Sequence, residues 1–254
     1  MNLHHTTLGS GPPLLVLHGL LGSHQNLLPA CRALAAQFQV FAIDQRNHGH
    51  SPHHDEMNYP VMADDIARFM DLHGIEAAHL LGHSMGGKTA MQFALNHPAR
   101  VHKLVVVDMS PREQGPRFAK LLAALRALQP TRFKTRLEAD QALALTVPEE
   151  SLRQFVLKNL MPDDQGGYRW RNNIEAIAAN YDRLREAVHG PAPFAGETLF
   201  VLGGKSDYVG DEDRQEIRRL FPSAQFETIA GAGHWVHAEK PAEFSGEVLK
   251  FLNA

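Results

Sequence analysis

Short, mostly apolar runs that alternate with longer amphipathic segments constrain the fold of this chain most. The runs are Leu14–Leu17, Val40–Ile43, His79–Leu81, Leu104–Val107, Leu199–Leu202 and Phe226–Ile229. Such runs are typical of strands that are buried on both faces of a parallel sheet, and the segments between them predict helices. The pattern therefore predicts an α/β fold with a mostly parallel, doubly wound sheet. Ligands of such sheets bind at the edge where the strands end.

The alternation is interrupted once, and the interruption predicts a helical cap. Three amphipathic patterns replace the strands there, namely Phe118–Leu128, Leu152–Leu160 and Ile174–Val188. The strand–helix pattern then resumes, which favours an insertion over the ligand edge rather than an independent domain. We therefore expect a core made of residues 1–110 and 193–254, with a helical cap at residues 111–192.

Charge and cysteine content exclude several classes of protein. The 254 residues include 25 Lys and Arg and 28 Asp and Glu, a formal charge of −3, which argues against nucleic acid as a partner. No apolar run approaches the ~18 residues of a membrane span, and no signal peptide is visible at the N-terminus. With Cys31 as the one cysteine, no internal disulfide can form. We expect a cytoplasmic monomer or weak homo-oligomer.

The sharpest local signal is the segment Gly82-His83-Ser84-Met85-Gly86-Gly87. It lies between a predicted strand and a predicted helix, the context in which a G-x-S-x-G motif forms a strained turn that exposes its serine. The turn also places Ser84 at a helix N-terminus, where free N–H groups face a developing anion. Ser84 is therefore the candidate nucleophile.

A serine hydroxyl needs a base, which His234 can supply. This histidine lies in Gly231-Ala232-Gly233-His234-Trp235, directly after the last predicted strand. An acid must then orient the imidazole, and two candidates exist. Asp108 ends a buried strand, whereas Asp207 lies in a polar turn after the next strand. Both precede His234, so the order serine, acid, histidine leaves the choice open.

Two backbone N–H groups should form an oxyanion hole. One is expected from Met85, the residue after the nucleophile, and the other from Leu20, in the glycine-containing loop after the first apolar run. His18, in the loop of Leu20, and Trp235, beside the candidate base His234, are expected to line the substrate pocket. His18 is expected to orient its loop rather than act as a second base.

The histidine content is high, at 16 residues, but it does not predict a metal site. The densest group comprises His48, His50, His53, His54 and Asp55. Its spacing matches no helix-face or zinc-finger pattern, so we expect a solvated loop and no metal.

Taken together, the segments around His18, Ser84 and His234 resemble the α/β-hydrolase fold family over essentially the whole chain. Closer similarity is to the small YbfF-type bacterial esterases, whose pattern resembles Arg46–Gly49, Val107–Pro111 and Gly231–Ala238. In most of the family the acid position corresponds to Ser206 here. In the YbfF-type group it corresponds to Asp108, so the resemblance favours Asp108 over Asp207.

The resemblance implies hydrolysis of carboxylic esters with short to medium acyl chains through an acyl-enzyme, with acyl-CoA thioesters as a second substrate class. It implies no cofactor. The same three residues also serve C–C bond hydrolases, lyases and perhydrolases. Cap arginines that face the pocket, such as Arg169 or Arg171, would favour an anionic substrate. A non-catalytic ligand-binding protein is a third reading, disfavoured by the intact serine, acid and histidine.

Overall fold

A seven-stranded sheet forms the centre of the protein, seen in a computed structural model that describes residues 1–164 and 166–254. Its strand order is β1-β3-β2-β4-β5-β8-β9. β1 pairs antiparallel with β3, and the other neighbouring pairs are parallel. The strands are β1 (His5–Leu8), β2 (Pro13–Leu17), β3 (Gln39–Ile43), β4 (Ala78–His83), β5 (Val101–Val107), β8 (Thr198–Gly203) and β9 (Ala224–Ile229). The predicted mostly parallel sheet is confirmed.

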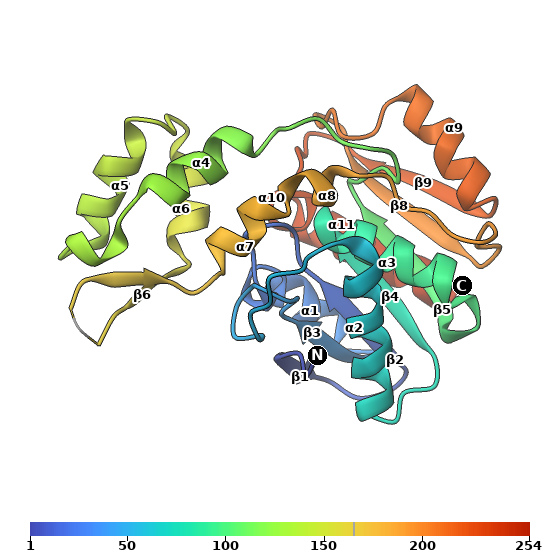
Figure 1. Ribbon diagram of the computed structural model, residues 1–254. Helices are drawn as coiled ribbons and strands as arrows, with labels where there is room; N and C mark the ends of the chain where they lie inside the picture. The colour runs from blue at the N-terminus through green and yellow to red at the C-terminus, as the bar shows by residue number, and fades with distance from the viewer. Residues whose placement is uncertain (165) are drawn as a thin grey trace.

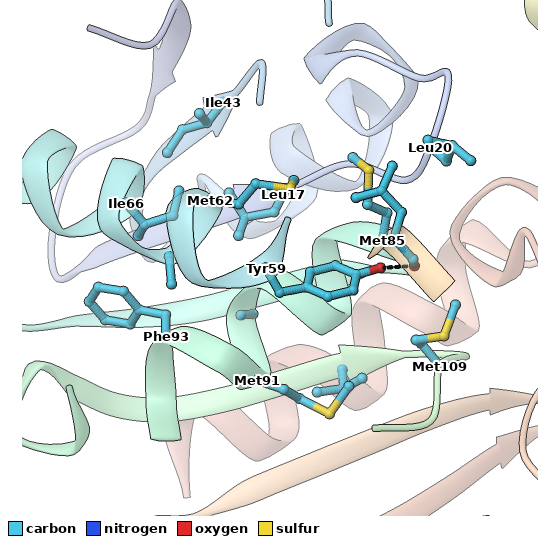
Figure 2. Close-up of a cluster of buried hydrophobic side chains, with 14 of the residues drawn as sticks. Leu17, Leu20, Ile43, Tyr59, Met62, Ile66, Met85, Met91, Phe93 and Met109 are labelled. Carbon is cyan, nitrogen blue, oxygen red and sulfur yellow. Dashed lines mark hydrogen bonds between the residues drawn. The ribbon is translucent and has the colours of Figure 1, made fainter. Parts of the chain in front are cut away.

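Helices cover both faces of this sheet, so it is doubly wound as predicted (Figure 1). One face packs against α1 (Leu28–Leu34) and α11 (Pro241–Asn253), whose Cys31 and Phe244 share a buried cluster with Val105. The other face packs against α2 (Tyr59–Leu72), α3 (Met85–Asn96) and α9 (Asp211–Leu220). Figure 2 shows part of this second layer. No helix in the described residues is long and apolar enough to cross a membrane.

Short helical turns complete the core. They are η1 (His24–Asn26), η2 (Pro98–Arg100) and α10 (Val236–Glu239).

The segment between β5 and β8 contains α4 (Ala119–Ala127), η3 (Pro130–Arg132), α5 (Arg136–Ala144), α6 (Glu150–Leu157), β6 (Leu160–Pro162), β7 (Tyr168–Trp170), α7 (Ile174–Ala179) and α8 (Tyr181–Arg185). In Figure 1, α4, α5, α6 and β6 extend to one side of the sheet, while α7 and α8 lie closer to the core. The predicted third cap helix is therefore wrong as one element, because Asn180 interrupts it. Its side-chain amide donates to the carbonyl of Asp55 in the core.

Buried polar contacts fix this insertion against the core. The ammonium group of Lys88 on α3, which has no exposed surface, donates to the carbonyls of Arg112, Arg185 and Glu186 at 2.6–3.1 Å. The hydroxyl of Tyr59 on α2 donates to the carbonyl of Leu184, the bond drawn in Figure 2. Both ends of the insertion are thus held beside the helix that follows Ser84. Treating residues 111–192 as a cap stays a prediction.

Candidate active site

Ser84 occupies a strained turn between β4 and α3. Its φ of 54° and ψ of −118° fall in a region that non-glycine residues rarely adopt. Two glycines make the turn possible. A Cβ on Gly82 would lie 2.1 Å from the carbonyl oxygen of Gly86, and a Cβ on Gly86 would lie 2.3 Å from that of Leu17. The turn therefore packs backbone against backbone and presents the serine at the N-terminus of α3.

Asp108 and His234 lie together at the same edge of the sheet. The carboxylate Oδ2 of Asp108, directly after β5, is 2.8 Å from Nδ1 of His234. It also accepts a hydrogen bond from the hydroxyl of Ser206, while Oδ1 accepts one from the backbone N–H of Gly203 at 3.0 Å. The aspartate is buried, so these donors replace its hydration and keep it fixed beside the imidazole.

Asp207, the alternative acid, has a different partner. Its side chain is 77% exposed and forms an ion pair with Arg117 of the insertion at 2.8 Å. The neighbouring residues nevertheless belong to the site. Ser206 donates to Asp108, and the ring of Tyr208 stacks on that of His234 with centroids 3.7 Å apart. The structure thus brings His234 to Asp108 and leaves Asp207 at the surface.

His83, one residue before Ser84, supports the loop that carries His234. Burial lowers its pKa well below the usual value, so the ring is neutral at pH 7. Its Nε2 is 3.0 Å from the carbonyl oxygen of His234, which can only accept, so this nitrogen donates. The sequence placed His83 in the motif but did not show this contact between the two loops.

The loop expected to contribute to the oxyanion hole is held by two buried histidines. Nε2 of His18 accepts from the backbone N–H of Gln45 at 3.1 Å, so Nδ1 carries the proton and donates to the carbonyl of Gly19. One ring nitrogen is therefore engaged within the loop after β2 and the other by the loop after β3, and an orienting role for His18 stays a prediction. Leu20 and Met85, the expected N–H donors, are both buried next to Ser84.

The second histidine, His48, was expected in a solvated loop, and that prediction is wrong. Its side chain is fully buried, and Nε2 accepts from the backbone N–H of Leu21 at 3.0 Å. Leu21 lies in a turn, with a positive φ of 60°, and belongs to no helix or strand. The bond from its N–H to His48 therefore satisfies a buried donor that has no partner in regular secondary structure. The rest of the group, His50 to Asp55, is largely exposed as expected. The histidine-rich, polar sequence around His48 predicted exposure and gave no sign that this side chain is buried and supports the loop of Leu21.

A different group, His4, His24 and Asp44, has the composition of a metal site among the residues the structure describes. The carboxylate of Asp44 accepts from Nδ1 of both histidines at 2.9–3.0 Å. It also accepts from the backbone N–H groups of His24 and His50. These hydrogen bonds engage both oxygens, and they brace the loops after β2 and β3.

Two cavities meet at Ser84. The larger, with a volume of about 630 Å³, is lined by His234 and by the predicted pocket residues His18 and Trp235. The smaller, about 40 Å³, lies toward Leu20 and Met85. The insertion contributes to both walls through Phe118. Substrate can therefore approach Ser84 from the side of His234 and extend in two directions.

The two arginines singled out in the insertion have different positions. Arg171 lines the larger cavity together with Lys158 and Asn159, which the sequence did not single out. Arg169, two residues earlier, is exposed and is not part of the lining. Periodicity could not make this distinction, because the short β6–β7 hairpin that orients both arginines was not predicted.

Comparison with known proteins gives one consistent result. The profile of the α/β-hydrolase fold family matches residues 12–241. The sn-1-specific diacylglycerol lipase ABHD11 of Xenopus laevis is 42% identical over 252 residues, covering 96% of this chain and 80% of the relative. Esterase YbfF of Escherichia coli K12 is 36% identical over 242 residues, covering 95% and 93%. A solved marine microorganism esterase superposes with a TM-score of 0.96 at 41% identity, covering 99% of both chains.

Proposed function

The chain belongs to the α/β-hydrolase fold family, as its sequence motifs predicted, and on this premise we propose that it is a serine hydrolase of carboxylic esters. The relatives named esterase and lipase support an ester hydrolase. We propose in addition that the acyl groups are short to medium in length and that the reaction proceeds through an acyl-enzyme. Acyl thioesters form the second candidate substrate class.

In the proposed reaction, the hydroxyl of Ser84 attacks the ester carbonyl while Nε2 of His234 takes its proton. Asp108 accepts a hydrogen bond from the Nδ1–H of His234, which holds the ring in the tautomer whose Nε2 is free to act as a base. The bond between the carbonyl carbon and the alcohol oxygen then breaks. His234 returns its proton to the departing alcohol, leaving an acyl group on Ser84.

The tetrahedral oxyanion is stabilised in this proposal by the backbone N–H groups of Leu20 and Met85. Loss of one such donor typically raises the barrier by about 3 kcal/mol. Since His18 and His48 hold the loop that carries Leu20, they contribute to preorganisation rather than to proton transfer. Water then attacks the acyl carbonyl, with His234 again as the base. The bond between the acyl carbon and Oγ of Ser84 breaks, His234 returns the proton to Ser84, and the carboxylic acid leaves.

The observation that carries the proposal is that His234, whose Nδ1 lies 2.8 Å from the carboxylate of Asp108, lines the same cavity as Ser84. A panel of p-nitrophenyl esters from acetate to octanoate, extended to acyl thioesters, would test it. We expect turnover of the short esters, which the Ser84→Ala variant should lose while remaining folded. A folded wild-type protein without turnover would favour a binding protein instead. Turnover that persists in the variant would exclude Ser84 as the nucleophile.

A further inference from the structure

The two cavities at Ser84 are not equivalent with respect to the proposed general acid. His234 lines the larger cavity, whereas the described lining of the smaller one includes Met85 and Met109 but not His234; Leu20 lines both. A group that protonates the departing atom must lie within hydrogen-bond reach of it. The departing alcohol therefore belongs in the larger cavity, and the acyl chain belongs in the smaller one.

The smaller cavity limits the acyl chain. Its volume of about 40 Å³ holds roughly three water-sized groups, since one such group needs about 10–15 Å³. Its walls are largely apolar and include Leu20, Met85, Met109 and Tyr59, which Figure 2 shows close together. An acetyl or propionyl group fits this space, and a longer chain would require the walls to move.

The larger cavity has two cations on the wall formed by the insertion. The Nη2 of Arg171 donates long hydrogen bonds, each 3.3 Å, to the carbonyl oxygen of Lys158 and to Oδ1 of Asn159. Its Nε is buried without a hydrogen-bond partner. Within residues 1–164 and 166–254, no carboxylate forms an ion pair with either Arg171 or Lys158.

Among the described residues, no other titratable group that lines this cavity forms an ion pair with these cations. Both oxygens of Glu239 are engaged by backbone N–H groups, those of Gly233 at 2.8 Å and Trp235 at 3.3 Å. Burial lowers the pKa of His18 and His237, so both rings are uncharged at pH 7. The guanidinium of Arg171 is held by two long hydrogen bonds and no carboxylate, and an anion in the cavity would supply it with a charged acceptor.

We propose that the preferred substrates are short-chain esters whose alcohol portion carries an anionic group, a phosphate or a carboxylate, bound by Arg171 and Lys158. The inference rests on the proposed ester hydrolysis and names the substrate class of that same site. Arg171 and Lys158 act in substrate recognition and take no part in proton transfer. They should therefore affect discrimination between substrates rather than the chemistry at Ser84.

Three acetate esters with similar leaving groups test this recognition: phenyl acetate, 4-acetoxybenzoate and 4-acetoxyphenyl phosphate. Each kcat/KM is divided by the rate of hydroxide-catalysed hydrolysis of the same ester. We expect the corrected kcat/KM of at least one anionic ester to exceed that of phenyl acetate. The anionic ester with the higher value shows whether the site prefers a carboxylate or a phosphate. In Arg171→Gln and in Lys158→Gln the preference should fall about tenfold, mainly through KM, while phenyl acetate turnover is kept.

Arg169→Gln is the matched control, because Arg169 lies in the same hairpin but outside the cavity lining. It should leave the preference unchanged. If the preference for the anionic esters over phenyl acetate is the same in the wild-type protein and in all three variants, the proposed anion site is overturned. Continued hydrolysis of phenyl acetate would still support the proposed ester hydrolase. Loss of all turnover in the wild-type protein would instead refute the proposed function. If Arg171→Gln fails to fold, the exposed Lys158 still decides the question.

Discussion

Replacing Asp108 by asparagine should disable the proposed base without disturbing the fold. The substituted amide can keep its oxygen toward the N–H of Gly203 and then directs its NH₂ group at Nδ1 of His234. Two donors cannot face each other, so the imidazole must move its proton from Nδ1 to Nε2. The nitrogen that should accept the proton of Ser84 is then already protonated.

The expected loss is large, because comparable substitutions of a triad acid lower kcat about 10⁴-fold. This corresponds to about 5.5 kcal/mol in the activation barrier. Steady-state hydrolysis of p-nitrophenyl acetate by Asp108→Asn measures it, and thermal unfolding of the same sample checks that the protein is folded.

Asp207→Asn provides the matched control. Its exposed ion pair with Arg117 is of a type that contributes about 0–1 kcal/mol to stability, so kcat should change less than about twofold. If Asp207→Asn were the inactive variant and Asp108→Asn the active one, the assignment of the acid would be reversed. Activity in both would refute the reasoning from the imidazole tautomer.

Three further predictions concern stability. Burial lowers the pKa of His48 to about 3 and that of His79 to about 4. Below pH 6.5 the unfolded chain therefore binds more protons than the folded protein. The folded state should lose stability as the pH falls from 6.5 toward 4. Urea unfolding between pH 7 and 5 measures this loss, and His79→Leu should reduce its slope by up to about 1.4 kcal/mol per pH unit; a flat profile would contradict it. His48→Ala leaves the buried N–H of Leu21 unpaired and should cost about 1–3 kcal/mol in urea unfolding at pH 7, with no change counting against the proposed support of the loop. Gly86→Ala should destabilise by about 1–3 kcal/mol through backbone overlap, whereas Gly246→Ala, with open space around it, should not; equal effects of the two would refute the packing argument.

The inner parallel strands could be predicted because burial on both faces requires continuous apolar residues, whereas the edge strand β9 is largely exposed and mixes polar with apolar residues. β1 escaped prediction because its residues, His5–Leu8, are mostly polar and partly exposed at the sheet edge. The third cap helix was predicted as one element because apolar spacing continues through it. Its interruption depends on a contact of Asn180 with a distant loop, which periodicity does not encode.

The nucleophile, base and oxyanion loops could be placed from local motifs, because glycine requirements and strand ends are visible in the sequence. The choice between Asp108 and Asp207 could not be made from spacing, since both follow strands. The family resemblance favoured Asp108, and the direction of the two side chains in the structure separates them. Likewise, the burial of His48 and the position of Arg171 depend on how loops pack on one another. The oligomeric state and the cellular compartment stay predictions.

Identifying the residue that forms the covalent intermediate tests the proposed role of Ser84 directly. Treatment with a fluorophosphonate followed by peptide mapping should place one phosphonyl group on Ser84. Labelling should slow strongly in Asp108→Asn and in His234→Ala, because activation of the serine depends on both. Stoichiometric modification of any other residue, or no modification of a folded and hydrolytically active protein, would exclude Ser84 as the nucleophile.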